Sequence, residues 1–405
     1  MPTLQSCLRF AWLFAATVLA APALAAAQEI ILFTFKGHDG EYPTADLTAD
    51  SAGNLYGTTN SFARDGGGLV FALTKKANGK YHERELYKFG NYPDGMRPNG
   101  VIRSKTGFLY GTTYWGGKGS DGDVFEIAPD GHKTELYTFT GASDGRMPNA
   151  GVVRDKAGNL YGTTIWGGAH NKGVVFKLTK TKGSGYAESV LHSFGGASDG
   201  VQPDAGLMAD KAGNLYGTTI VGGSGNCSAG GCGTVYKITP GGHETVLYNF
   251  NGGSDGNYPY ADVIKDAQGN LYGTAYVGGS GNNGVVFKLA PDGTETVLHS
   301  FAGGSDGANP YAGVIADTAG NLYGTTVYGG SSNLGTVFKL APDGTETVLH
   351  SFAGNDGRYP QAGLIADEAG NLYGATQFGG PGTCNPLLPL GCGVVFEIEN
   401  SRSAL

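Results

Sequence analysis

The chain has 405 residues, of which 72 are glycine, and a formal net charge of -8 with only 15% charged residues. An acidic chain without a basic run is a poor candidate for binding nucleic acid. The high glycine content, with 40% hydrophobic residues and no collagen period, predicts many short strands joined by tight turns rather than disorder.

Residues 1–27 have the features of a signal peptide. Arg9 supplies a positive charge, residues 10–20 form an apolar core, and residues 23–25 or 25–27 offer small side chains for cleavage. The apolar core is too short for a membrane span, and no second apolar stretch follows. We therefore expect a secreted protein, periplasmic or extracellular, with no membrane span and a polar tail at 399–405.

Two markers recur through the rest of the chain. The segment Asn-Leu-Tyr-Gly-Thr-Thr, or a close variant, occurs seven times with its tyrosines 50 to 56 residues apart, and Asp-Gly-x-x-Pro also occurs seven times. Each unit contains four β-prone runs, which in the sixth unit are residues 312–316, 321–326, 335–340 and 346–352. Four antiparallel strands repeated seven times are typical of a seven-bladed β-propeller, and an open β-solenoid fits less well. The sequence therefore predicts one all-β propeller over residues 29–398.

The two ends of this region predict how the ring closes. The last unit stops after its third run at residues 394–398, whereas the chain opens with residues 30–35, which match the missing fourth run. Pairing of the two would remove both exposed sheet edges of an open array.

Four cysteines remain after the signal peptide, in two close pairs. Cys227 and Cys232 lie in the fourth unit, and Cys384 and Cys392 lie in the seventh. In an exported chain this pattern predicts two local disulfides, and the separation of the pairs argues against a zinc site.

The repeat is similar to that of a known family. Asp-x-x-Gly-Asn-Leu-Tyr-Gly-Thr-Thr, followed by Gly-Gly and then Gly-x-Val-Phe-Lys-Leu, resembles the GloVer (Gloeo/Verruco) tandem repeat of exported bacterial proteins over residues 29–398. The second unit departs at residues 104–108, and the first has no clean Gly-Gly after Thr59. The resemblance implies export and a propeller-like array, and no established activity.

Residues present in every unit are interpreted as architectural, because chemistry needs one or two groups rather than seven identical ones. This applies to Asp39 and its six counterparts, which we expect to cap turns, with weak calcium sites as the alternative. His192, His299 and His350 share a position with tyrosines in other units and are also interpreted as structural.

The candidate ligand-binding residues vary between units on the face that carries the long loops. They lie between Asp-Gly and Pro or just before Gly-Gly, where Phe62 is the equivalent expected in the first unit. Aromatic rings suit stacking on sugars, and arginines suit carboxylate or sulfate groups, although both could simply fill gaps between blades. The candidates are Tyr42, Arg97, Trp115, Arg146, Trp166, Tyr258, Tyr328, Arg358 and Tyr359.

Catalytic candidates are fewer. Asp46 and Asp262 replace a glycine usual at the start of the first strand, and Asp204 lies two residues before that glycine in its own unit. His38 and His170 lie outside any repeated position. Such groups are of the type used for glycoside hydrolysis or a lyase reaction, but blades 1 and 5, which hold Asp46 and Asp262, are expected to be well separated.

The first hypothesis is an extracellular binding module for glycans or a protein ligand, acting as a monomer without a metal or other cofactor. The alternatives are an exported polysaccharide lyase or hydrolase, and a structural or adhesion spacer. Fold alone cannot choose among them, because propellers serve all three purposes.

Overall fold

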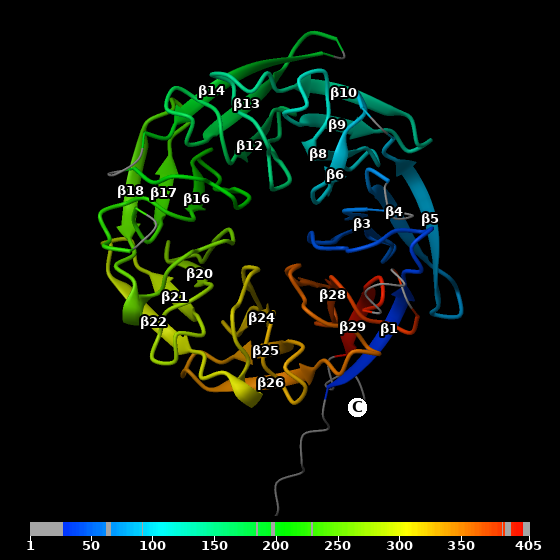
Figure 1. Cartoon of the computed structure of the whole chain (residues 1–405), viewed down its shortest axis with the longest axis vertical. Coiled ribbons are helices and arrows are strands. Elements are labelled where there is room, and N and C mark those ends of the chain that lie inside the picture. The colour runs from blue at the N-terminus through cyan, green and yellow to red at the C-terminus, as the bar shows by residue number, and fades with distance from the viewer. Residues whose placement is uncertain are drawn as a thin grey trace, which may run out of the picture.

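In the computed structural model, seven antiparallel sheets, six of four strands and one of five, surround a central opening (Figure 1). The structure describes residues 27–61, 66–90, 92–183, 185–195, 199–227, 230–382, 384 and 390–399. The predicted signal peptide, apart from Ala27, and the tail from residue 400 onward lie outside these residues. The predicted all-β seven-bladed propeller is confirmed.

Blades I to III are formed by consecutive strands, and blade II has one additional strand, β6. Blade I contains β2 (Thr48–Ala49), β3 (Leu55–Thr59), β4 (Leu69–Lys75) and β5 (Tyr81–Lys88). Blade II contains β6 (Met96–Pro98), β7 (Ile102–Arg103), β8 (Leu109–Trp115), β9 (Asp123–Ile127) and β10 (Lys133–Thr138). Blade III contains β11 (Val153–Arg154), β12 (Leu160–Thr164), β13 (Val174–Lys180) and β14 (Tyr186–Ser193).

Blades IV to VI repeat this order, and two short 3-10 turns, η1 (Gly253–Asp255) and η2 (Gly304–Asp306), follow blades IV and V. Blade IV contains β15 (Met208–Ala209), β16 (Leu215–Thr219), β17 (Thr234–Ile238) and β18 (Glu244–Asn249). Blade V contains β19 (Ile264–Lys265), β20 (Leu271–Ala275), β21 (Val285–Leu289) and β22 (Glu295–Ser300). Blade VI contains β23 (Ile315–Ala316), β24 (Leu322–Thr326), β25 (Thr336–Leu340) and β26 (Glu346–Ser351).

Blade VII joins the two ends of the chain, as the sequence predicts. Its order is β1 (Gln28–Thr34), β29 (Val394–Glu399), β28 (Leu372–Thr376) and β27 (Ile365–Ala366). β1 and β29 pair antiparallel, with Gln28 opposite Glu399 and Thr34 opposite Val394. Figure 1 shows the blue N-terminal strand lying beside the red C-terminal strand.

The innermost strand of each blade is shorter than predicted. It has two residues, for example Ile315–Ala316 where five were expected, because the segment before it contacts the preceding blade instead of continuing the sheet. Thr163 Oγ1 donates to the carbonyl of Ala205 in the next blade (2.9 Å), and the same bond recurs at four other junctions.

The core consists of aromatic contacts between neighbouring blades. A phenylalanine after each outer strand packs edge-on against an aromatic ring of the third strand of the next blade, with ring centroids 5.1 to 5.2 Å apart at all seven junctions. That third-strand ring covers the glycine of Leu-Tyr-Gly-Thr. A Cβ on Gly162 would lie 2.6 Å from Cζ of Phe176, so the repeated glycine is required for packing.

Candidate functional site

The repeated aspartate of Asp-Gly-x-x-Pro caps the loop after each outer strand. Asp144 accepts bonds from the backbone N–H of Thr140 and from the Tyr137 hydroxyl, both at 2.8 Å. In blade III, His192 takes the place of the tyrosine and bonds Asp199 at 3.2 Å. These bonds use the carboxylate oxygens that calcium would need, and they explain why histidine and tyrosine interchange here.

A second repeated carboxyl faces this cap at six of the seven junctions. Each of six glutamates lies on an outer strand near the capping aspartate of the preceding blade, and has one buried oxygen without a hydrogen-bond partner among the described residues. Burial, with a smaller contribution from nearby charges such as the capping aspartate, raises the pKa of every one to about 7. The six are Glu29, Glu83, Glu188, Glu244, Glu295 and Glu346.

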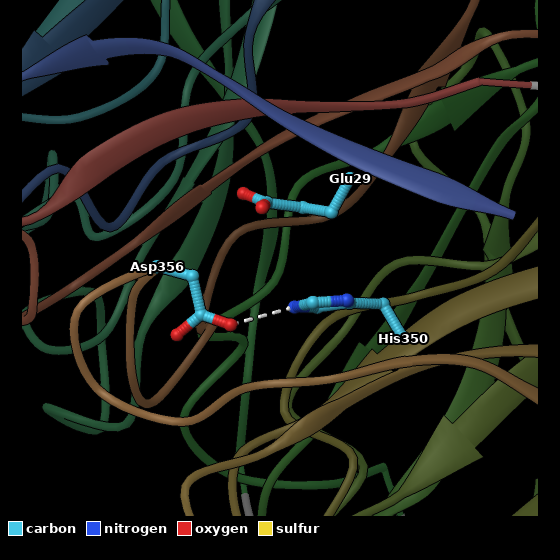
Figure 2. A group of neighbouring side chains, drawn as sticks. All are labelled: Glu29, His350 and Asp356. Carbon is cyan, nitrogen blue, oxygen red and sulfur yellow. Dashed lines mark hydrogen bonds and ion pairs between the residues drawn. The ribbon is translucent and has the colours of Figure 1, made fainter.

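Figure 2 shows this arrangement where the ring closes, with Glu29 of β1 beside His350 and Asp356. Their ligand-type atoms lie within 4.8 Å of one another, and His350 Nε2 is 3.0 Å from Asp356 Oδ2. Glu, His and Asp occupy the same positions at two other junctions, whereas tyrosine replaces the histidine at three junctions and Phe33 replaces it at the seventh. We therefore assign the group to the repeated junction rather than to a special site.

The junction between blades I and II departs from this pattern. Lys133 takes the place of the glutamate and lies 2.6 Å from Asp94 and 3.5 Å from the fully buried Asp123. Burial raises the pKa of Asp123 to about 6 although Lys133 opposes this shift, whereas hydrogen bonds and Lys133 hold the pKa of Asp94 below its usual value.

A cavity of about 600 Å³ occupies the central channel and gathers residues from all seven blades. The residue directly after each repeat proline lines it, which gives a ring of seven varied side chains, here called the post-proline ring. Its members are Thr44, Asn99, Asn149, Asp204, Tyr260, Tyr311 and Gln361.

Two members of the post-proline ring form an aromatic wall. Tyr260 and Tyr311 are stacked with ring centroids 4.9 Å apart and an interplanar angle of 19°. Tyr276 packs edge-on against both, at 5.5 and 6.2 Å. Farther round the ring, Asp204 is 7% exposed and accepts a bond of 2.8 Å from the Asn149 side chain. Burial raises the pKa of Asp204 to about 6, and the Asn149 bond opposes this shift.

Asp46 and Asp262 also line the cavity, two residues after the post-proline ring. Burial and the nearby Asp46 charge raise the pKa of Asp262 to about 7, so the two carboxyls interact although they belong to blades I and V. Blades I and V are separated around the ring as expected, with blades VI and VII between them, but both side chains line the same cavity. Burial also raises the pKa of Asp46, whose Oδ1 accepts a bond of 2.6 Å from the Gly363 N–H. The Asp46 side chain is exposed, but it faces the solvent inside the channel, where protein surrounds it.

A neighbouring cavity of about 610 Å³ brings together three of the predicted ligand residues. Tyr42, Arg97 and Trp115 line it, and Arg97 also lines the channel cavity. Tyr42 packs on Phe378 with centroids 5.0 Å apart. From there an aromatic rim continues through Tyr359 (6.1 Å) to Tyr328 (5.3 Å from Tyr359).

The other predicted residues lie elsewhere. Arg146 and Arg358 pair through backbone bridges with Trp166 and Phe378, and neither arginine lines either cavity. Tyr258 packs against Tyr260 at 6.3 Å.

His38 and His170 are exposed and line neither cavity. Phe62 lies outside the described residues, and the bridge between Glu41 and Ser61 places Ser61 at the position expected for it. Both predicted disulfides are present, Cys227–Cys232 and Cys384–Cys392.

Sequence reasoning missed Tyr260 and Tyr311. The available signal was that the residue directly after each repeat proline varies between units. That this residue lies on the channel wall becomes evident only once the short inner strands are known. The deletion of one residue between Asn99 and Gly100 in the second unit hid this register. The deletion also explains why Thr58 Oγ1 has no hydrogen-bond partner among the described residues, whereas the equivalent threonines donate to a carbonyl of the next blade.

The repeat identifies the family to which this chain belongs. The model of the Gloeobacter/Verrucomicrobia repeat matches residues 22–230 and 225–405. The chain belongs to the Gloeobacter/Verrucomicrobia repeat family. No curated protein matches its sequence.

Among solved structures, this Gloeobacter/Verrucomicrobia repeat protein is similar to the extracellular domain of a one-component system from B. thetaiotaomicron. The identity is 11% and the TM-score 0.55, over 92% of this chain and 40% of that one, so the chain spans less than half of that protein's length. A gluconolactonase from Xanthomonas campestris aligns at 13% identity with a TM-score of 0.45, over 93% of this chain and 90% of that one. At these identities the likeness concerns the fold alone. No helix in the described part of the chain is long and apolar enough to cross a membrane.

Proposed function

We propose that this protein is an exported binding module that holds one end of a saccharide at the mouth of its central channel. The observation that carries the proposal is the stacked pair Tyr260 and Tyr311 in the same cavity as the hydrogen-bonded Asn149 and Asp204. Sugars have apolar ring faces and polar edges, and aromatic walls with a few fixed polar groups complement both.

The second cavity extends this surface outward. Trp115 and Tyr42 line it, and Arg97 connects it to the channel. We expect a saccharide of several units to place one sugar in the channel and the next beside Trp115, because Asn60 and Arg97 line both cavities. Export is supported by the two disulfides and by the signal-like segment at the N-terminus, because disulfides persist in oxidising compartments.

The test is a glycan array probed with the mature protein and with Tyr260→Ala. Tyr260 is partly buried at the cavity wall, so thermal unfolding of the variant is measured in parallel to establish that it folds. The proposal predicts that binding to at least one saccharide class is lost in the folded variant. Absence of binding to every polysaccharide would favour a spacer or adhesion unit instead.

A second candidate is an exported glycoside hydrolase or polysaccharide lyase. Its support is the presence of two carboxyls with raised pKa values, Asp204 at about 6 and Asp262 at about 7, in one cavity, where they would serve as acid and base near neutral pH. Activity screening on neutral and uronate polysaccharides tests it. Activity unchanged in both Asp204→Asn and Asp262→Asn would remove these residues from such a mechanism.

A further inference from the structure

The channel cavity has more negative than positive groups. Its lining includes three carboxylates, Asp46, Asp204 and Asp262, and one cationic side chain, Arg97. Asp204 is bonded by Asn149 and Asp46 by Gly363. Within the described part of the chain, the Asp262 carboxylate accepts a hydrogen bond only from its own backbone N–H. Two carboxylates from blades I and V therefore line one cavity, and neither has a cationic hydrogen-bond or ion-pair partner among the described residues.

These two aspartates are departures from the repeat. The other five blades have glycine at the same position, namely Gly100, Gly151, Gly206, Gly313 and Gly363. The aspartates lie against two of those glycines. A Cβ on Gly313 would lie 3.0 Å from Asp262 Oδ1, and a Cβ on Gly363 would lie 3.0 Å from Asp46 Oδ1. Because five blades form without a carboxylate here, the propeller fold does not require Asp46 or Asp262.

We propose that the channel receives a positively charged group of its ligand, that Asp46 and Asp262 bind this group, and that the ligand is a cationic amino sugar. The inference rests on the proposed function, because it specifies the charge of the saccharide end that enters the cavity. It reverses the preference for acidic glycans that arginines on this face suggest, since Arg97 alone among Arg97, Arg146 and Arg358 lines the channel.

Electrostatics favours this ligand class. A cleft lined by charges of one sign concentrates ions of the opposite sign, and low-dielectric walls strengthen the effect. A cation placed between the two carboxylates relieves their mutual repulsion, and the faces of Tyr260 and Tyr311 add cation–π attraction. A uronate would instead meet three carboxylates of the same sign.

The same geometry predicts a pH dependence for binding. Titratable groups that face the cavity are Asp46, Asp204, Asp262, Arg97, Tyr114, Tyr260 and Tyr311. The pKa of Asp262 lies at about 7 in the free protein, so this carboxyl becomes neutral as the pH falls below 7. A permanently charged ligand should therefore bind more weakly at pH 5 than at pH 8.

The experiment is calorimetric titration of the mature protein at low salt with three probes. These are a chito-oligosaccharide carrying N,N,N-trimethyl groups, the neutral N-acetylated oligosaccharide of the same length, and tetramethylammonium alone. We expect the cationic sugar to bind at least about tenfold more tightly than the neutral one at pH 8. Asp46→Asn combined with Asp262→Asn should abolish this difference while neutral-sugar binding persists.

The two proposals fail in different ways. Equal affinity for the cationic and neutral sugars, or a preference that survives in the Asn variant, overturns the cation site while the saccharide site stands. Binding of tetramethylammonium by the wild type and not by the Asn variant, without binding of either sugar, supports the cation site and overturns an amino sugar as its ligand. If none of the probes binds, the cation site is wrong, and the glycan array decides the saccharide function separately.

Discussion

Carboxyl groups lie in two regions of this propeller, at the outer junctions between blades and inside the central channel. At the junctions a glutamate faces a capping aspartate in six of seven blades, whereas in the channel Asp46 and Asp262 occupy two of seven equivalent positions. Burial raises pKa values in both regions, so a raised pKa alone does not identify a functional group. The channel aspartates differ from the junction glutamates because they occur at positions where the other blades have glycine.

The largest expected effect on stability concerns the junction between blades I and II, where Lys133 replaces the repeated glutamate. Lys133→Met leaves the buried Asp123 beside Asp94 without a cation, and should lower the free energy of unfolding by about 3 kcal/mol or more. Urea denaturation at pH 7 measures it.

A matched variant sharpens this test. Lys133→Glu combined with Asp123→Val recreates the junction of blade III, where Val174 and Glu188 stand at these positions. It should retain most of the wild-type stability. A double variant as unstable as Lys133→Met would show that this junction depends on more than its charges.

The six junction glutamates predict how stability varies with pH. Their pKa values of about 7 in the folded protein exceed the ordinary 4.5, so their contribution to stability is fully present below pH 4.5 and is lost as the pH rises through 7. Turn aspartates such as Asp155 have lowered pKa values and contribute stability that is lost at pH below about 4. Stability should therefore be greatest near pH 4 to 5.

The slope of unfolding free energy against pH between 5 and 7 measures this effect. It should correspond to uptake of several protons on folding, of which these glutamates supply up to about six, and Glu346→Gln should reduce it by about one proton. A flat profile over this range would contradict the assignment of these glutamates.

Two tryptophans at the same repeat position provide the matched pair for ligand binding. Trp115 lines the second cavity and Trp166 lines neither cavity. Trp115→Ala should weaken saccharide binding about tenfold, or about 1.4 kcal/mol, because a stacking surface is lost. Trp166→Ala should leave the affinity unchanged. Calorimetric titration with a saccharide identified on the array measures both, and equal losses would place the ligand outside these cavities.

The bonds between blades allow a finer comparison. Thr163→Val removes a buried donor and leaves the Ala205 carbonyl unsatisfied, which should cost about 1 kcal/mol. Thr58→Val at the equivalent position removes a hydroxyl whose oxygen has no hydrogen-bond partner among the described residues, and should be neutral or slightly stabilising. Urea denaturation of both variants measures the difference, and similar losses would mean that Thr58 is bonded in solution.

The fold could be predicted from the sequence because every blade contains the same sequence motifs in the same order. Seven copies of Leu-Tyr-Gly-Thr-Thr or a close variant fix the number of blades, and the unmatched run at residues 30–35 predicts how the ring closes. The candidate site was predicted only in part. Asp46, Asp204 and Asp262 were recognised as departures, but their convergence depends on channel geometry that spacing along the chain does not contain. The stacking of Tyr260 on Tyr311 depends equally on how adjacent blades lean toward each other.

The central claim is that residues departing from the repeat in the channel serve binding and are not needed for folding. The free energy of unfolding of the Asp46→Asn, Asp262→Asn double variant at pH 8 tests it most directly, since asparagine keeps the side-chain shape and still accepts the Gly363 bond. We predict stability equal to the wild type or higher by up to about 1 kcal/mol, because a repulsion between confined carboxylates is removed. A loss of about 2 kcal/mol or more would contradict the claim, because it would show that these two carboxylates stabilise the fold.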